Sequence, residues 1–375
     1  MIVRDTGMSA DSIAKPEEIT PVVETGQPSP AASPAVNPPT ANATLNTVLA
    51  PANRDEFNRT GLNFRLPMPR PKVRGAVIDI HTHLLAARHA KPWFAAADHY
   101  GITTFVSMTP LEEAMGIQRD WPGRVHFIAV PRWGDASIDN WLRRLDAFYN
   151  MGSRIIKFHM APATMNRTNL RLDSPEIRRI IRHAVDRDMI LMSHVGDPDT
   201  WYARQYADTA KFGTRDEHYR IWEDTLSEFR DRPWLGAHLG GNPEDPDRLQ
   251  HLLDTYPNLY LDCSATRWMV REVSTRRDAM REFFIRNQDR ICFGTDQVSG
   301  NDRDFDFCAS RFWCHRKLWE TAYQGPSPII DPDLPKDQQP TLRGLALPDE
   351  VLQKLYHDNA VALLRRVGVE LDPGA

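Results

Sequence analysis

The chain has 375 residues, 41% of them hydrophobic and 26% charged, which is the composition of an ordinary globular protein. Its formal net charge is −4 and it has no long basic run, which argues against nucleic acid or an anionic membrane as the main partner. No apolar run approaches the roughly 20 residues of a membrane span, and the N-terminus lacks the apolar core of a signal peptide. The expected location is therefore cytoplasmic.

Residues 1–72 differ in composition from the rest of the chain. Eleven of the 29 prolines lie there, and Phe57 is the first aromatic residue. Such a segment buries too little apolar surface to offset the entropy lost on ordering. We expect a disordered Pro/Ala-rich tail or linker over 1–72, of which residues 53–72 could form an extended arm against the domain. A single folded domain is expected over 73–375.

Short β-branched runs alternate with longer amphipathic stretches from Gly75 onward. Consecutive apolar residues in the short runs predict strands buried on both faces. The eight predicted strands are 76–84, 103–109, 125–131, 154–160, 189–195, 234–240, 259–265 and 291–297. Helices are predicted over 137–152, 174–188, 216–231 and 245–256. The first two have serine caps at Ser137 and Ser174, and Pro175 suits a first helical turn.

Eight strands with intervening helices fit either a closed parallel barrel or an open doubly wound sheet. The span from Gly75 to about Arg366 is somewhat longer than a typical barrel of about 250 residues. The surplus fits two long loops, 197–215 and 297–346, the second an insertion or flap. The strand count favours a (β/α)₈ TIM barrel of the α/β class.

Four scattered cysteines form no C-x-x-C pair, so a disulfide framework is not expected. We expect reduced and partly buried thiols at Cys263, Cys292, Cys308 and Cys314.

Five histidines lie at or just beyond the predicted strand ends, where barrels build their active sites. His81 and His83 are the clearest pair, because residues i and i+2 of a strand point to one face and imidazole is the commonest metal ligand. Asp79 should point the same way, one step deeper. The alternative is that both are simply polar residues at a strand end.

Three further polar residues end later strands. His194 predicts a metal ligand, or else a hydrogen-bonded core histidine. His238 precedes a Gly-Gly pair and predicts either a fourth ligand or, as we favour, a catalytic group that polarises the substrate and moves protons. Asp296 can both bind metal and accept a proton from metal-bound water. This set suits zinc, iron, manganese or nickel.

Lys157 and His159 share one face of the fourth strand and are candidate substrate-binding residues. Lys157 has three interpretations. It could be carboxylated and bridge two metal ions, stay cationic and bind a substrate carboxylate, or pair with a neighbouring acid.

Taken together, H-x-H on the first strand, histidines on the fifth and sixth and aspartate on the eighth resemble the amidohydrolase superfamily. The strings AHLGG, FGTD and LPDEVLQKLYHDNAVALL are similar to its amidohydrolase-related branch, which includes aminocarboxymuconate-semialdehyde decarboxylase and resorcylate-type decarboxylases. The resemblance spans about residues 75–366. It implies a mononuclear site with His81, His83, His194 and Asp296 as ligands and His238 as a catalytic residue.

Two features limit how far the roles of the family's residues can be assigned to this chain. Lys157 occupies the strand where binuclear members place a carboxylated lysine, so a second ion is a weaker alternative. The aromatic loop from Asp197 matches no member of known substrate. Within and beyond it, Trp201 could stack on a substrate ring, and Arg267 could anchor a carboxylate or form only a surface salt bridge.

The expected function is a metal-dependent hydrolase that acts on a C–O or C–N bond of a small, carboxylate-bearing substrate through metal-activated water. One alternative is a non-oxidative decarboxylase of an aromatic or dienoic acid. The other is a non-catalytic binding protein on a barrel scaffold. We expect the protein to bind one divalent metal ion, with zinc as the leading candidate, and a small-molecule substrate. A homodimer is a possible assembly.

Overall fold

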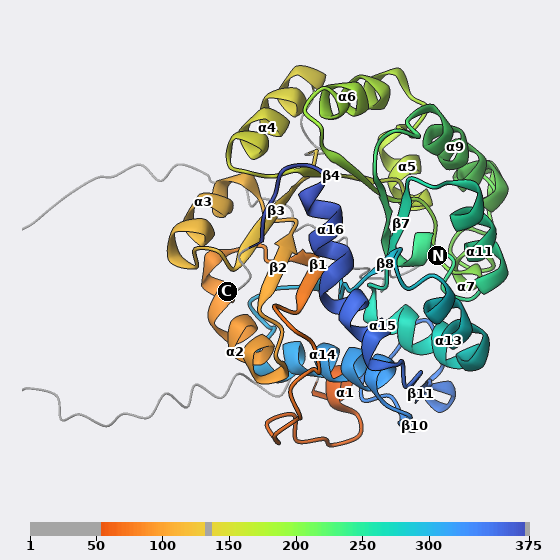
Figure 1. Ribbon diagram of the computed structural model, residues 1–375. Helices are drawn as coiled ribbons and strands as arrows, with labels where there is room; N and C mark the ends of the chain where they lie inside the picture. The colour runs from red at the N-terminus through yellow and green to blue at the C-terminus, as the bar shows by residue number, and fades with distance from the viewer. Residues whose placement is uncertain (1–53, 132–136, 372–375) are drawn as a thin grey trace, which may run out of the picture. The chain divides into compact units, whose positions relative to one another are not determined.

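A computed structural model describes residues 54–131 and 137–371 of the protein. Most of the predicted tail, residues 1–53, lies outside the described residues. Within them, nine short strands form one parallel sheet in the order β8-β7-β6-β5-β4-β3-β2-β1-β9 (Figure 1). They are β1 Ile78–His83, β2 Thr104–Ser107, β3 Val125–Ala129, β4 Ile155–His159, β5 Ile190–His194, β6 Trp234–Gly236, β7 Leu259–Asp262, β8 Ile291–Cys292 and β9 Gln297–Val298.

The two ends of the sheet belong to one segment, and this closes the barrel. β8 pairs with β7, whereas β9, five residues further on, pairs with β1. Between them, the Ile80 amide donates to the Phe293 carbonyl at 2.9 Å, and the Asp296 amide donates to the His81 carbonyl at 2.8 Å. The predicted eighth strand is therefore split in two, and the predicted (β/α)₈ barrel is confirmed.

The barrel interior is filled by aliphatic side chains from inward-facing strand positions, including Ile78, Val106, Ile128, Ile190 and Leu235. Helix α16, Asn359–Arg365, adds Ala360, Leu363 and Leu364 to this cluster. It crosses the barrel at the N-terminal ends of the strands (Figure 1), where the Asn359 side chain donates to the carbonyl of Ile291 at the start of β8. One end of the barrel is therefore plugged, which leaves the C-terminal end for a site.

The outer helices follow the predicted alternation. Ser137 caps α4 by accepting a hydrogen bond from the Asn140 amide, whereas Ser174 accepts from the Arg171 amide and does not cap α6. Thr214 and Glu217 form a capping box on α9. The principal helices are α2 Ala90–Tyr100, α3 Leu111–Asp120, α4 Ile138–Asn150, α5 Pro162–Thr168, α6 Pro175–Val185, α9 Arg215–Glu228, α11 Pro246–Thr255, α13 Arg277–Arg286, α14 Phe305–Glu320 and α15 Asp349–Gln353.

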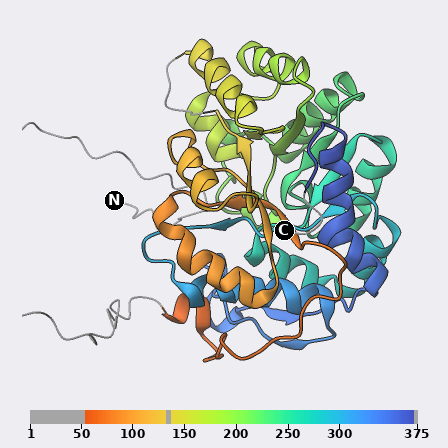
Figure 2. The ribbon, with the colours of Figure 1, turned by 60° about the vertical axis from the view of Figure 1, so that its left-hand side comes forward.

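The second long loop was predicted incorrectly, because 297–346 contains the 16-residue helix α14 and a hairpin of β10 Gln324–Pro326 and β11 Thr341–Arg343. α14 packs against α2, far away in sequence (Figures 1 and 2), and the Arg316 guanidinium donates to the Tyr100 carbonyl at 3.1 Å. Because α14 is buried on several sides, it lacks the one-sided apolar stripe that reveals a surface helix. The first long loop contains the short helices α7 Asp199–Tyr202 and α8 Thr209–Phe212.

Residues 54–72 form the expected arm. α1, Arg54–Asn58, and the extended chain after it bury Phe57 and Phe64 against the domain. The Arg59 guanidinium donates to the Ser327 carbonyl at 2.7 Å, and the Tyr100 hydroxyl donates to the Phe64 carbonyl. This part of the predicted tail is therefore ordered against the barrel.

All four cysteines are buried free thiols, as predicted. Among the described residues, no helix has the length and apolar character that a membrane crossing requires.

Candidate active site

The predicted site residues gather at the C-terminal ends of the strands. His83, His159 and His194 are the last residues of β1, β4 and β5. Because β4 and β5 are parallel and in register, His159 lies directly beside His194, with ring centroids 4.7 Å apart. The clustering inferred from the strand ends is therefore present in three dimensions.

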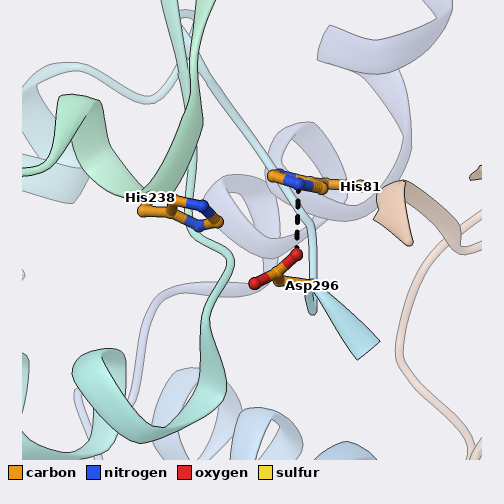
Figure 3. A group of neighbouring side chains, drawn as sticks. All are labelled: His81, His238 and Asp296. Atoms are coloured by element: carbon orange, nitrogen blue, oxygen red, sulfur yellow. Dashed lines mark ion pairs between the residues drawn. The ribbon is translucent and has the colours of Figure 1, made fainter. Parts of the chain in front are cut away.

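His81, His83 and Asp296 converge on a single point. The Nε2 atoms of His81 and His83 lie 3.3 and 3.0 Å from Oδ1 of Asp296. Figure 3 shows the Asp296 carboxylate pointing toward the His81 ring, with the His238 ring beside them. His81, His238 and Asp296 each offer one ligand atom, and these atoms lie within 4.8 Å of one another. His83 and His194 are not part of that group.

The backbone at His238 is unusual, and it decides where the ring lies. His238, Leu239, Gly240 and Gly241 all have φ between 53° and 76°, the left-handed region. A side chain on Gly241 would place its Cβ 2.3 Å from the Gly196 carbonyl oxygen, so two loops meet backbone to backbone there. The His238 ring stacks on His81 at 4.9 Å and meets His194 edge-on at 4.6 Å.

Asp262 and Ser264, at the end of β7, hold the two central imidazoles. Asp262 is fully buried and accepts from His81 Nδ1 at 2.9 Å and from the His238 backbone amide at 3.0 Å. The Ser264 hydroxyl donates to Asp262 Oδ1, so its oxygen is left to accept from His238 Nδ1, 2.7 Å away. Both imidazoles are thereby assigned a proton on Nδ1, which leaves the Nε2 lone pairs for the site.

Sequence reasoning missed Asp262 and Ser264, although a signal was present. Asp262 ends a buried apolar strand, just as Asp296 and the histidines do. Asp79, expected to point at the site, instead accepts hydrogen bonds from the Thr295 amide and hydroxyl at 3.0 and 2.6 Å. Its carboxylate also accepts from the His81 backbone amide at 3.3 Å, and the pairing of β1 with β2 shifts register between Asp79 and Thr82.

His194 is oriented by a second buried acid. Its Nε2 lies 2.8 Å from Oδ1 of Asp197, whose Oδ2 accepts from the Tyr206 hydroxyl at 2.6 Å. With a proton on Nε2, His194 presents Nδ1 to a ligand. Asp197 follows the strand in the loop predicted as a turn, and sequence reasoning gave it no role.

Lys157 lies in the centre of the site. Its Nζ is 2.7 Å from Nε2 of His81, the nitrogen that the tautomer assignment leaves unprotonated. His159 contacts the Thr164 hydroxyl through Nδ1 at 2.7 Å. Of the three interpretations of Lys157, this contact supports none alone, because the partner is an imidazole rather than an acid.

The aromatic residues line one side of the histidine cluster. Trp268 meets the His238 ring edge-on at 5.4 Å, and Trp201 meets Trp268 at 5.5 Å. The Trp201 indole N–H donates to Asp333 at 2.7 Å, which ties the loop after β5 to the loop before β11. Arg267 precedes Trp268 and is half-buried, without an ion pair within the described ranges. Its predicted surface salt bridge is therefore not seen.

The charge states of the buried groups suit a cation. Burial would raise the pKa of Asp296, but the His238 and His81 imidazoles hold that pKa well below its usual range. Burial also opposes ionisation of Asp262, and His81 again lowers its pKa. Burial lowers the pKa of His83 and, much further, that of His238. Burial and Lys157 oppose protonation of His81, but the Asp262 and Asp296 carboxylates raise its pKa. At neutral pH the site therefore holds two carboxylates beside the neutral imidazoles of His83 and His238, whereas His81 must release any second proton when a metal binds.

The donor set passes the test for a divalent ion. Imidazole nitrogens and a carboxylate oxygen are the ligands of zinc and similar metals. Asp262 accepts from Nδ1 of His81, as a carboxylate usually does behind a metal-binding histidine. The Lys157 ammonium competes with a metal ion for Nε2 of His81, because it must move away from that nitrogen when an ion binds there.

Changing Asp262 to asparagine is expected to weaken metal binding by about 10–100-fold, because the amide no longer holds the proton on His81 Nδ1. Metal competition titration measures this, with the exposed Asp254→Asn as control. Unchanged affinity would show that Asp262 does not orient His81.

Residues 113–366 match the family model described as Amidohydrolase. The chain is similar in structure to an uncharacterised TIM-barrel protein from Bordetella bronchiseptica, with a TM-score of 0.51, 14% identity, and coverage of 78% of this chain and 100% of that one. It is also similar to a protein proposed to be a 2-pyrone-4,6-dicarboxylic acid hydrolase from Pseudomonas putida (TM-score 0.47, 12% identity, 79% and 99% covered).

A third similar structure is 5-carboxyvanillate decarboxylase from Novosphingobium aromaticivorans, complexed with manganese and 4-hydroxy-3-methoxy-5-nitrobenzoic acid (TM-score 0.44, 13% identity, 81% and 99% covered). Curated protein sequences give no match. At these identities the similarities concern the fold alone, which is that of a TIM barrel.

Proposed function

The chain belongs to the amidohydrolase family, and from that premise we propose that it is a metal-dependent hydrolase of a C–O or C–N bond in a small, carboxylate-bearing molecule. The observation that carries the proposal is the convergence of His81, His83 and Asp296, with both imidazole Nε2 atoms within 3.3 Å of one carboxylate oxygen. Few structural roles require so many buried titratable groups in contact.

The proposed ligands are His81, His83, His194 and Asp296, around one ion, with zinc as the first choice. When bound, a divalent ion supplies a Lewis acid that polarises a substrate carbonyl and activates water at neutral pH. Asp262 and Asp197 orient His81 and His194 from behind. Zinc, a cytoplasmic location and a homodimer stay predictions.

Asp296 and His238 are the proposed proton carriers. Asp296 is ionised and accepts the proton of the attacking water at its carboxylate. His238 is neutral, with its Nδ1 proton held by Ser264, so its Nε2 is free to take up a proton. His238 Nε2 accepts the second proton of the attacking water and donates it as a hydrogen bond to the oxygen that gains negative charge. Asp296 returns the first proton to the leaving group, and His238 releases its proton to solvent as the carboxylate product leaves.

The proposed substrate-binding residues lie around this centre. Lys157 and His159 lie on the β4 side, and Trp201 and Arg267 belong to the β5 and β7 loops. Trp268, which sequence reasoning overlooked, forms the aromatic wall between Trp201 and His238. A planar substrate would stack there.

That aromatic wall favours one alternative, a non-oxidative decarboxylase of an aromatic or dienoic acid. Here an active-site acid would protonate the ring carbon before carbon dioxide leaves. Incubating metal-loaded protein with an ester, lactone and amide panel and, separately, with benzoates separates the two reactions. Hydrolysis without release of carbon dioxide supports the hydrolase. Release of carbon dioxide from a benzoate would show that the protein is a carboxy-lyase instead. A protein that holds no metal after reconstitution and turns over neither panel would be the non-catalytic binding protein.

Replacing Lys157 with methionine tests the ion count. If one ion binds, loss of the ammonium beside His81 Nε2 is expected to tighten metal binding by about tenfold or more, because two like charges no longer share the site. Metal analysis gives the number of ions per chain, and competition titration gives the metal affinity. The exposed Lys72→Met is the control. A fall from two ions per chain to one or none would instead establish a carboxylated, bridging Lys157.

A further inference from the structure

Three arginines gather beside the active site, in a place that the proposed reaction does not explain. Arg267 lies in the short helix α12, Thr266–Trp268. Arg303 precedes α14, and Arg311 lies in the second turn of that helix. The Arg311 and Arg303 guanidinium carbons lie 3.6 and 4.9 Å from the centre of the Phe307 ring. Arg267 is close enough to act electrostatically on both of the others.

No described acid lies within ion-pair distance of this cluster, although Asp302, Glu56 and Asp331 act on it from further away. Within residues 56–131 and 137–371, none of the three arginines has a carboxylate oxygen within 4.0 Å, although most buried arginines here do, as Arg271 does with Asp331. Arg311 is only 8% exposed, and its hydrogen bonds run from Nη1 alone, to the Ser310 hydroxyl and the Phe307 carbonyl. Burial, reinforced by Arg267 and Arg303, lowers the pKa of Arg311 to about 9. Such an arrangement costs stability unless something anionic joins it.

An uncharged residue, Gln297, also points to a binding site beside these arginines. Gln297, in β9, is 2% exposed, and neither its Oε1 nor its Nε2 has a hydrogen bond of normal geometry within the described part of the chain. It faces the thiol of Cys308, a weak hydrogen-bonding group that also lies in the field of Arg311 and Arg303. A buried amide whose described neighbour is only a thiol is rare and needs a reason.

The cluster adjoins the proposed metal centre. Gln297 directly follows Asp296 in the chain. On the other side, Arg267 stands between Thr266, whose hydroxyl donates to the Thr295 carbonyl at 3.4 Å, and Trp268, which contacts His238. From outside, the arm packs Phe57 on Phe307 at 5.7 Å, and Glu56, an acid that acts on Arg303 and Arg311, is exposed to solvent. The arm therefore covers the ring on which two of the arginines lie, and it brings no ion-paired carboxylate to them.

We propose that Arg267, Arg303, Arg311 and Gln297 form a binding pocket for an anionic group, a carboxylate or a phosphate, on the substrate and away from the bond that reacts. Guanidinium groups bind both anions through paired hydrogen bonds, and the Gln297 amide N–H completes the set. The assignment of the anion to the substrate rests on the proposed function, but the pocket itself does not. It also gives Arg267 a specific role, as one of three cations rather than a lone anchor.

Anion-dependent thermal unfolding of the full chain tests the pocket, both as purified and after metal removal with a chelator. Inorganic phosphate and, in a separate arm, glutarate are titrated against chloride at equal ionic strength. We expect a saturating rise in melting temperature for one of them, and the arm that gives it identifies the anion. In Arg311→Met the protein without anion should melt higher, while its affinity for the anion should fall about 10–100-fold.

Gln297→Leu provides a second variant that leaves the charge unchanged, and Arg182→Met, at an exposed arginine of α6, is the matched control. An equal rise in wild type, Arg311→Met and Gln297→Leu would mean surface binding only and would overturn the pocket, as would no rise with either anion. Because the measurement needs neither metal nor turnover, its failure leaves the hydrolase proposal standing. Conversely, a protein without hydrolase activity can still show the pocket.

Discussion

Replacing Asp296 with alanine is expected to abolish both metal retention and turnover. Asp296 is the carboxylate on which His81 and His83 converge, at 3.3 and 3.0 Å, and it is also the proposed acceptor of the proton from water. One substitution therefore removes a ligand and a base together. Metal content after dialysis and the rate on the responsive substrate panel are the two measurements.

A backbone effect must be separated from this loss. Asp296 has a φ of 54°, a conformation that costs alanine about 1 kcal/mol and that asparagine tolerates better. Asp296→Asn keeps the backbone and removes only the charge, so it should also lose metal and activity while its melting temperature follows that of the metal-free wild type. The exposed Asp231→Asn is the control. Full metal occupancy in both Asp296 variants would refute the proposed site.

His238→Asn is expected to retain the metal and to lower the turnover rate by about 10²–10³ or more, the usual effect of losing a group that stabilises an oxyanion. Asparagine suits this position because it accepts the left-handed backbone that His238 adopts at φ 56°. The effect should fall on the maximal rate rather than on substrate affinity, because the Nε2 proton is needed only as charge develops. Steady-state kinetics with parallel metal analysis measures it.

The alternative role for His238 has a distinct signature. Its ligand atom lies within 4.8 Å of those of His81 and Asp296, so it could hold the ion itself. In that case His238→Asn would lose metal as completely as Asp296→Ala does, and added metal would restore part of the rate. The exposed His251→Asn should match wild type in both measurements.

Local pattern was sufficient for the barrel and for much of the candidate site. Strands buried on both faces must be apolar at consecutive positions, so the eight runs were visible, and a polar residue at the end of such a run stands out. His81, His83, His194 and Asp296 were found in this way, because β-strand geometry fixes which end of each strand they occupy. Asp262 carries an equal signal, since it too ends a buried apolar strand.

Other features depend on contacts between segments far apart in the chain, and no local pattern encodes them. α14 was missed because burial on several sides removes the amphipathic period that identifies a helix. Ser264 is an ordinary serine until the fold places it 2.7 Å from His238. The proposed anion pocket joins Arg267, Gln297 and Arg311 from three elements, and the absence of an ion-paired acid at the described arginines is a property of the surroundings. Sequence thus determined which groups face the open end of the barrel, whereas tertiary packing decided which of them touch, because strand period acts over a few residues and packing acts across the whole chain.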